Sequence, residues 1–188
     1  IASRGELDEL AQAAQAAPDD VAKQLLLALL ALENGQVPLA RRALGQAQKL
    51  DPTDPDLRFL SARASATEGR FDAAKSELLA LVQSGADGYA VQMALAEVAT
   101  ALKDGAARRP ALEAAHRHDP LALEPLKELW RLAAEQKDVA WESQVLEQLA
   151  VLDQHDGNVY RRLLELLVQQ KDYTRAVSHG QAAVYADM

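Results

Sequence analysis

The sequence contains no cysteine, which excludes disulfide bonds, thiol nucleophiles and cysteine-ligated metals. Aromatic residues make up only 4% of the 188 residues, and isoleucine occurs once, at Ile1. Leucine and alanine must therefore supply any hydrophobic core. Basic residues are also in the minority, because 20 Lys and Arg stand against 28 Asp and Glu. The resulting net charge of −8 argues against a nucleic-acid-binding surface, which needs a basic stripe.

Long hydrophobic runs are missing as well. The longest, residues 25–32, has eight residues, whereas a helix that spans a bilayer needs about 20. We therefore expect no membrane insertion. No targeting segment is visible, so we expect a piece of a longer protein, and the compartment stays open between cytoplasm and periplasm. The composition, rich in Ala, Leu and Arg, is typical of a GC-rich bacterial source.

A repeat of 34 residues is the strongest pattern in the chain. Residues 35–40 align with residues 69–74 at this offset, without any insertion or deletion. Pro18, Pro52 and Pro120 share one phase of the same period. Further positions in step are Leu44, Leu78, Leu112 and Leu146. Self-similarity at a fixed period of this size indicates a stack of small structural units.

Each half of a repeat predicts an amphipathic helix. Leu26, Leu27 and Leu30 follow the 3.6-residue period, and Gly35 then breaks the pattern in the middle of the unit. One helix pair of this size cannot bury its own apolar stripe, but stacked neighbours can. We therefore predict an all-α fold, an α-solenoid of stacked antiparallel helix pairs with about 11 helices.

The repeat resembles the tetratricopeptide repeat family. That family places small, aromatic and large apolar residues at fixed positions of a helix pair and closes on proline. In residues 55–88 the matching positions are Ala62, Gly69, Phe71, Ala74 and Leu78. In residues 157–188 they include Tyr160, Leu163, Tyr173 and Ala176. The resemblance covers the whole chain and implies a right-handed superhelix.

The period also predicts the boundaries of the repeats. We expect a single array over residues 1–188, starting with a half repeat over residues 1–20 that has only its second helix. Five full repeats follow, over residues 21–54, 55–88, 89–122, 123–156 and 157–188.

Two repeats depart from the pattern. In the third, Pro110 favours a second helix that starts late, near residues 108–110, after a loop over residues 103–107. In the fourth, Trp130 and Glu142 stand in columns that the family fills with small residues. This bulk indicates either a bend of the superhelix or a contact with a partner or subunit.

Three lysines occupy the column of Gly35 and Gly69. They are Lys103, Lys137 and Lys171. The substitution predicts either a non-glycine residue in the left-handed region, at a cost of about 1 kcal/mol, or a longer turn.

The sequence carries no recognisable catalytic, cofactor-binding or metal-binding motif. His116 and His118 are two residues apart on a predicted helix and so point in nearly opposite directions, which favours ordinary surface histidines over a metal site. No phosphate-binding glycine loop and no nucleophile elbow is present. We therefore expect no catalytic residue, no cofactor and no metal in this segment.

The family resemblance implies a concave groove, lined by the first helix of each repeat, in which partner peptides lie. One groove-facing column reads Leu25, Phe59, Met93, Lys127 and Arg161. The column one turn further on reads Leu29, Arg63, Glu97 and Arg131. The first part of the predicted groove is thus apolar, and the second part is basic.

Lys127 and Arg131 resemble the last part of a carboxylate clamp. Members of the family that bind chaperone tails use such a clamp, but its other columns here hold Leu, Phe and Met. We therefore consider a partial anion-binding end. The alternative is that these bases balance neighbouring acids such as Glu124 and Glu128 on solvated faces.

The leading functional hypothesis is a non-enzymatic interaction module or scaffold that binds a peptide or helical segment of a protein partner in the groove. The alternative is a structural spacer or oligomerisation arm of a larger bacterial protein, with enzymatic or secretion-related parts elsewhere. Uncapped terminal helices would then favour self-association. Nucleic acid is not expected as a partner.

Overall fold

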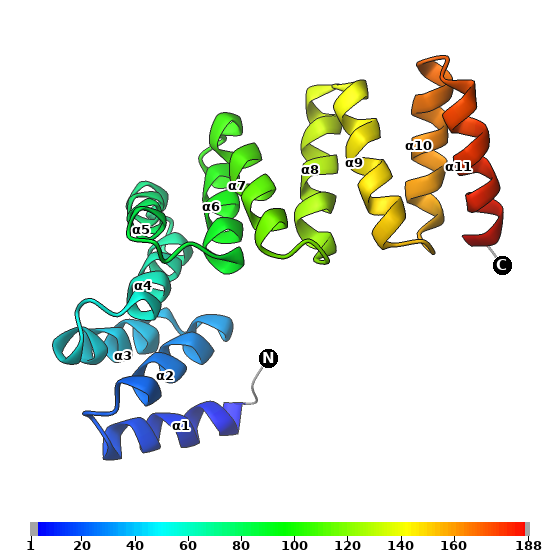
Figure 1. The fold of residues 1–188 in the computed structure, drawn as a ribbon. Helices are drawn as coiled ribbons and strands as arrows, with labels where there is room; N and C mark the ends of the chain where they lie inside the picture. Colours follow the sequence, from blue (N-terminus) through cyan, green and yellow to red (C-terminus); the bar gives the residue numbers. More distant parts are fainter. Residues whose placement is uncertain (1–3, 187–188) are drawn as a thin grey trace. The chain divides into compact units, whose positions relative to one another are not determined.

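The computed structural model describes residues 4–186, which form eleven α-helices and no strand (Figure 1). Residues 1–3 and 187–188, the outer ends of the first and last predicted repeats, lie outside the described residues. The predicted all-α fold and number of helices are confirmed. The helices are α1 (Arg4–Ala16), α2 (Val21–Glu33), α3 (Val37–Leu50), α4 (Pro55–Thr67), α5 (Phe71–Gln83), α6 (Tyr89–Ala101), α7 (Gly105–His118), α8 (Leu123–Gln136), α9 (Val139–Leu152), α10 (Gly157–Gln169) and α11 (Tyr173–Ala186).

From α2 onward the helices come in pairs joined by short turns. Each predicted repeat range contains one pair, beginning with α2 and α3 in residues 21–54. The members of four pairs, α2 with α3, α4 with α5, α8 with α9 and α10 with α11, pack on each other. Helix α3 also packs on α4, as α5 does on α6 and α9 on α10. Short connections make consecutive helices antiparallel, so the first helices of neighbouring pairs, such as α2 and α4, run in the same direction.

The chain divides into two compact units, Ile1–Arg108 and Arg109–Met188. Each has a core of leucine and alanine, as the composition required. Fully buried leucines of the first unit are Leu7, Leu57, Leu78 and Leu81. Those of the second unit are Leu112, Leu126, Leu146, Leu149, Leu163, Leu166 and Leu167. Alanines with no exposed surface, such as Ala28 and Ala62, let the helices approach closely.

Aspartates fix where several helices begin. Asp20 accepts a hydrogen bond from the backbone N–H of Lys23 at 3.0 Å, and Asp138 accepts one from that of Trp141 at 3.0 Å. Aspartate is among the best N-cap residues because its carboxylate satisfies a helix N–H that lacks a partner within the helix.

The turn inside each pair uses one residue in the left-handed region. Gly35 and Gly69 have φ angles of 69° and 77°, and Lys137 in the same column has a φ of 57°. Lys103 and Lys171 adopt the same conformation. Of the two alternatives predicted for these lysines, the left-handed backbone conformation is therefore confirmed, and the longer turn is not. A backbone hydrogen bond of 3.1 Å from Asp138 to the carbonyl of Ala133 closes the turn after α8 and compensates for part of the strain.

The prediction that the helix of the third repeat starts late is wrong. Helix α7 begins at Gly105, and Pro110 lies inside it. The capping residue decides the start, because Asp104 accepts a hydrogen bond from the backbone N–H of Ala107 at 3.0 Å. The amine of Lys75 on α5 lies 2.7 Å from the same carboxylate and lowers its pKa. Capping at Asp104 thus outweighs the cost of one proline in the second turn.

The bulk of Trp130 and Glu142 is absorbed by a buried polar contact. Trp130 is half-buried, and its indole Nε1 donates a hydrogen bond to Glu142 Oε1 at 3.1 Å. Arg162 on α10 donates from Nε and Nη2 to the two carboxylate oxygens at 2.8 and 3.1 Å. Glu142 is only 2% exposed, so these three hydrogen bonds satisfy a charge that would otherwise be costly to bury.

Candidate functional site

A groove of about 640 Å³ lies between α2 and α4 in the first unit. Its size is within the usual range of ligand sites, roughly 300–1,000 Å³. The lining is mostly apolar and comes from the N-terminal parts of both helices. The lining residues are Val21, Ala22, Leu25, Leu26, Leu29, Asp54, Asp56, Phe59 and Leu60.

Three predicted site residues meet in this groove. Leu25, Leu29 and Phe59 are half-buried, because they pack against the core cluster of the first unit on one side and line the groove on the other. Leu26 also lines the groove and is 46% exposed. A continuous apolar lining that the fold leaves accessible is characteristic of a contact surface.

The groove ends in two carboxylates at the start of α4. Asp54 caps the helix, since its Oδ1 accepts hydrogen bonds from the backbone N–H groups of Asp56 and Leu57 at 2.7 and 3.2 Å. Asp56 is exposed, and its carboxylate forms no ion pair within the part of the chain that the structure describes. The apolar groove is thus acidic at one end.

The remaining predicted residues of the first unit lie outside this groove. Arg63 is half-buried on α4, one turn beyond Phe59. Met93 is half-buried and Glu97 is exposed, both on α6. The 34-residue offset that selected Arg63, Met93 and Glu97 as groove residues is therefore not sufficient to place a side chain in this groove.

The predicted basic residues belong to the second unit and differ in their partners. Arg131 forms ion pairs with Glu128 and, at 3.9 Å, with Glu124, so acids of its own helix neutralise it. Lys127 is half-buried and Arg161 is exposed, and neither forms an ion pair with another described residue. Among the three predicted basic residues of the second unit, Lys127 and Arg161 are thus the two whose charge no described acid balances.

Sequence reasoning missed part of the groove. Leu26, Leu60, Asp54 and Asp56 all line it. A signal for Asp56 was available, because it precedes Phe59 by three residues and so shares a helix face with it. No comparable signal marks Leu26, because Leu60, at the same position of the next repeat, is buried.

A second hollow, of about 370 Å³, lies where α1 meets the pair of α2 and α3. Gln24 is buried beside it and donates a hydrogen bond to the carbonyl of Ala14 at 3.0 Å. This contact fastens α2 to α1. The hollow is therefore part of the packing of the first helix against its neighbours.

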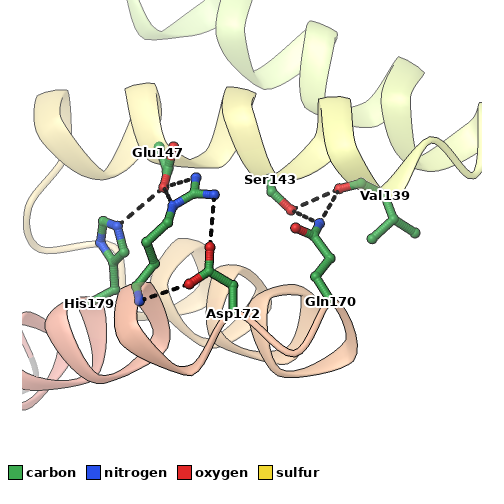
Figure 2. Close-up of polar contacts among 7 residues, drawn as sticks. Val139, Ser143, Glu147, Gln170, Asp172 and His179 are labelled. Carbon is green, nitrogen blue, oxygen red and sulfur yellow. Dashed lines mark hydrogen bonds and ion pairs between the residues drawn. The ribbon is translucent and has the colours of Figure 1, made fainter.

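A polar cluster connects α9 to the last two helices of the second unit (Figure 2). Gln170 donates from Nε2 to Ser143 Oγ at 2.7 Å, and Ser143 itself donates to a backbone carbonyl one turn earlier. Further along α9, Glu147 Oε1 accepts a hydrogen bond from Arg175 Nε at 2.9 Å and lies 3.4 Å from Nε2 of His179. Ser143 and His179 thus have separate partners, and the cluster joins helices instead of pairing a hydroxyl with an imidazole.

The described residues contain no group of three or more His, Asp or Glu side chains that could hold a metal ion. Among the helices of residues 4–186, none has the length and apolar character needed to cross a bilayer.

Comparison with known proteins shows what part of the chain is similar to. The family model for the tetratricopeptide repeat matches residues 31–98, which include α4 and its side of the groove but not the groove residues of α2. No curated protein sequence matches the chain.

Several solved structures share the fold. The crystal structure of YrrB, described as a TPR protein with an unusual peptide-binding site, has a TM-score of 0.67 at 12% identity, over 95% of this chain and 92% of YrrB. The crystal structure of MamA gives a TM-score of 0.67 at 13% identity, over 89% and 91% of the two chains. PilF of Pseudomonas aeruginosa gives a TM-score of 0.63 at 19% identity, over 97% of this chain and 79% of PilF. At these identities the likeness establishes the fold alone.

Proposed function

Because residues 31–98 are tetratricopeptide repeats and the described chain has the fold of tetratricopeptide repeat proteins, we propose that it is a non-enzymatic module that binds a segment of a partner protein in the groove between α2 and α4. Proteins with this fold generally mediate protein–protein interactions. The observation that carries the proposal is the accessible apolar lining around Leu25, Leu29 and Phe59.

The groove would act through preformed apolar anchors. Leu25, Leu29 and Phe59 are held in place by the core behind them, so binding orders the partner and hardly changes the repeat. An extended or helical segment with two or three large apolar side chains would fill the groove. Met93, one repeat further on the same column, would extend the apolar contact.

Site-specific photo-crosslinking tests the proposal. Leu26 is replaced with the photoreactive residue p-benzoylphenylalanine in the native host, and the exposed Leu79 of α5 serves as matched control, since it is 41% exposed against 46% for Leu26 and lies outside the groove. We expect a defined partner protein to crosslink at Leu26 only. Leu26→Asp should then weaken binding of a peptide cut from that partner at least tenfold, with unchanged helicity. Equal crosslinking at both sites, or at neither, would contradict the proposal.

The second unit supplies a separate basic surface in this proposal. Lys127 and Arg161 carry charges that no described acid balances, and Arg131 is neutralised by its own helix. An acidic stretch of a partner would lie against Lys127 and Arg161. Its contribution to the binding free energy would decrease as the salt concentration rises.

A second function, self-association, is favoured by one observation. Tyr173 and Val177, one turn apart on α11, are 60% and 63% exposed. Large apolar side chains that are exposed together on one helix face are characteristic of a contact surface. We expect sedimentation coefficients that rise with protein concentration and become constant in a Val177→Lys variant. A monomer at all concentrations would leave the binding module as the only candidate.

A further inference from the structure

We propose that the segment bound in the groove carries a lysine or arginine directly beside its apolar stretch, and that this residue lies against Asp54 and Asp56. The inference rests on the proposed function and adds the charge and the direction of the partner. It follows from how charges are distributed along the two helices that form the groove.

The exposed face of α4 carries an acid, an apolar anchor and a base in a row. Asp56, Phe59 and Arg63 are spaced by three and four residues and therefore share one helix face. From the first to the last of them the helix rises about 10 Å. The acidic position lines the groove, whereas Arg63 lies one turn beyond it. The groove wall formed by α4 thus carries negative charge at its start and positive charge beyond its other end.

The groove wall formed by α2 carries no charged residue that could balance the charges of α4. The 34-residue offset places Ala22, Leu25 and Leu29 of α2 at the positions of Asp56, Phe59 and Arg63. All three are uncharged.

Two bases, Lys23 and Arg58, are close in sequence to groove residues, but neither lines the groove. Lys23, which follows Ala22, is paired with Asp20 at 2.6 Å. Arg58 of α4 is exposed, does not line the groove and forms no ion pair with another described residue. Asp54 and Asp56 therefore present negative charge to an occupant of the groove.

These carboxylates select the occupant, while the apolar lining supplies most of the affinity. Asp54 uses Oδ1 for the helix cap, and its second oxygen remains available, as does the carboxylate of Asp56. An exposed ion pair changes an equilibrium constant by about fivefold at most. Charges at the rim of an interface mainly govern which partner binds and in which direction.

Arg63 makes the reverse direction unfavourable, because it would repel a basic residue at the far end. Glu97 on α6 occupies the column of Arg63 one repeat later, and the structure shows no ion pair between the two side chains. The far end is therefore of mixed charge, and the Asp54 end is the one that attracts a base.

Selection from a phage-displayed library of random dodecapeptides on the full chain tests the inference. We expect enriched peptides in which Lys or Arg flanks an apolar stretch. Their affinity at about 50 mM salt should fall fivefold to tenfold in the Asp54→Asn/Asp56→Asn variant. Asparagine keeps the N-cap, so the helix start is preserved. Asp72→Asn is the matched control, since Asp72 is an exposed first-turn acid of α5 outside the groove, and its effect should stay within twofold.

A photo-crosslinker beside the basic flank of an enriched peptide tests the direction. It should label residues near Asp54 and Asp56, and labelling centred on Arg63 would overturn the assigned direction. Enriched peptides without a basic flank, or with equal affinity for the double variant, would overturn the charge assignment and leave the groove in place. If no peptide is enriched, or if enriched peptides bind Leu26→Asp as well as the wild type, the proposed function itself fails.

Discussion

The indole Nε1 of Trp130 donates a hydrogen bond to Oε1 of Glu142 at 3.1 Å, so the two oversized residues of the fourth repeat are partners. Trp130 stands in the column of Ala28, Ala62 and Ala96, and Glu142 stands in the column of Ala40, Ala74 and Ala176. Arg162 from the next repeat completes the arrangement by a bidentate contact with the same carboxylate. A steric mismatch in the sequence thus becomes a polar contact across α8, α9 and α10.

Removing the carboxylate should destabilise the second unit. Glu142→Ala leaves the Trp130 indole and the Arg162 guanidinium without their acceptor, and we expect a loss of about 2–3 kcal/mol, because Arg162 retains partial access to water. Urea unfolding followed by circular dichroism measures the loss. Gln148→Ala, at an exposed position of the same helix, should change stability by less than about 0.5 kcal/mol. Equal effects of the two changes would mean that the buried contact contributes nothing.

Glycine should stabilise the turn after α8 more than lysine does. Lys137 has a φ of 57°, so Lys137→Gly should raise the free energy of unfolding by up to about 1 kcal/mol. The same change inside the helix, Lys127→Gly, should lower it by about 1 kcal/mol. Thermal melts of the two variants should therefore shift in opposite directions, and a shared direction would refute the strain at Lys137.

Pro110 should be replaceable with a gain in stability. It lies inside α7, where its ring removes one backbone hydrogen bond, so Pro110→Ala should stabilise the chain by about 1–3 kcal/mol. Pro38→Ala provides the comparison, because Pro38 lies in the first turn of α3, where proline is tolerated and limits the unfolded chain. We expect no gain there. Differential scanning calorimetry measures both, and a loss for Pro110→Ala would show that the proline fits α7 without cost.

Stability should depend on Glu68 in acid. The hydrogen bond from Arg41 lowers the pKa of Glu68 from 4.5 to about 2, with a further contribution from Arg70. A depressed pKa means that the stabilisation is complete above about pH 4.5 and is lost as the pH falls towards 2. The stability difference between the wild type and Glu68→Gln should therefore shrink over this range. Burial raises the pKa of Glu77, and Arg41 and Arg70 oppose that rise, so both proteins are compared in a Glu77→Gln background.

Denaturant titrations between pH 2 and 6 measure that difference. High salt provides the control, because about 1 M NaCl screens an exposed pair and should reduce the difference at every pH. A constant difference across the pH range would show that the pair between Arg41 and Glu68 does not favour the folded state.

Lys127 and Arg161 should contribute more than Arg131 to the binding of an acidic peptide. Lys127→Glu and Arg161→Glu should each weaken the binding of a fluorescent glutamate-rich peptide several-fold at low salt, and the double variant should lose most of the salt dependence. Arg131→Ala should have a smaller effect, since Glu124 and Glu128 already balance its charge. Fluorescence anisotropy measures the three affinities, and an equal loss for all three would contradict the distinction.

The period of the sequence was sufficient to predict the helices and part of the groove. Periodicity and the 34-residue offset are local properties, and each predicted repeat range contains one helix pair. The offset also selected Leu25, Leu29 and Phe59, which line the groove between α2 and α4. The same reasoning failed for the start of α7, because a proline rule considered one residue and ignored the cap at Asp104.

The sequence by itself determined that leucine- and alanine-rich helices must pair and stack, because no single pair hides its apolar stripe. Only the tertiary structure decided which charges stay unbalanced. It left Lys127 without an ion pair among the described residues and brought Asp54 and Asp56 to the end of the groove. Those outcomes depend on side-chain conformations and on how neighbouring helices pack, which a repeating pattern of residues does not encode.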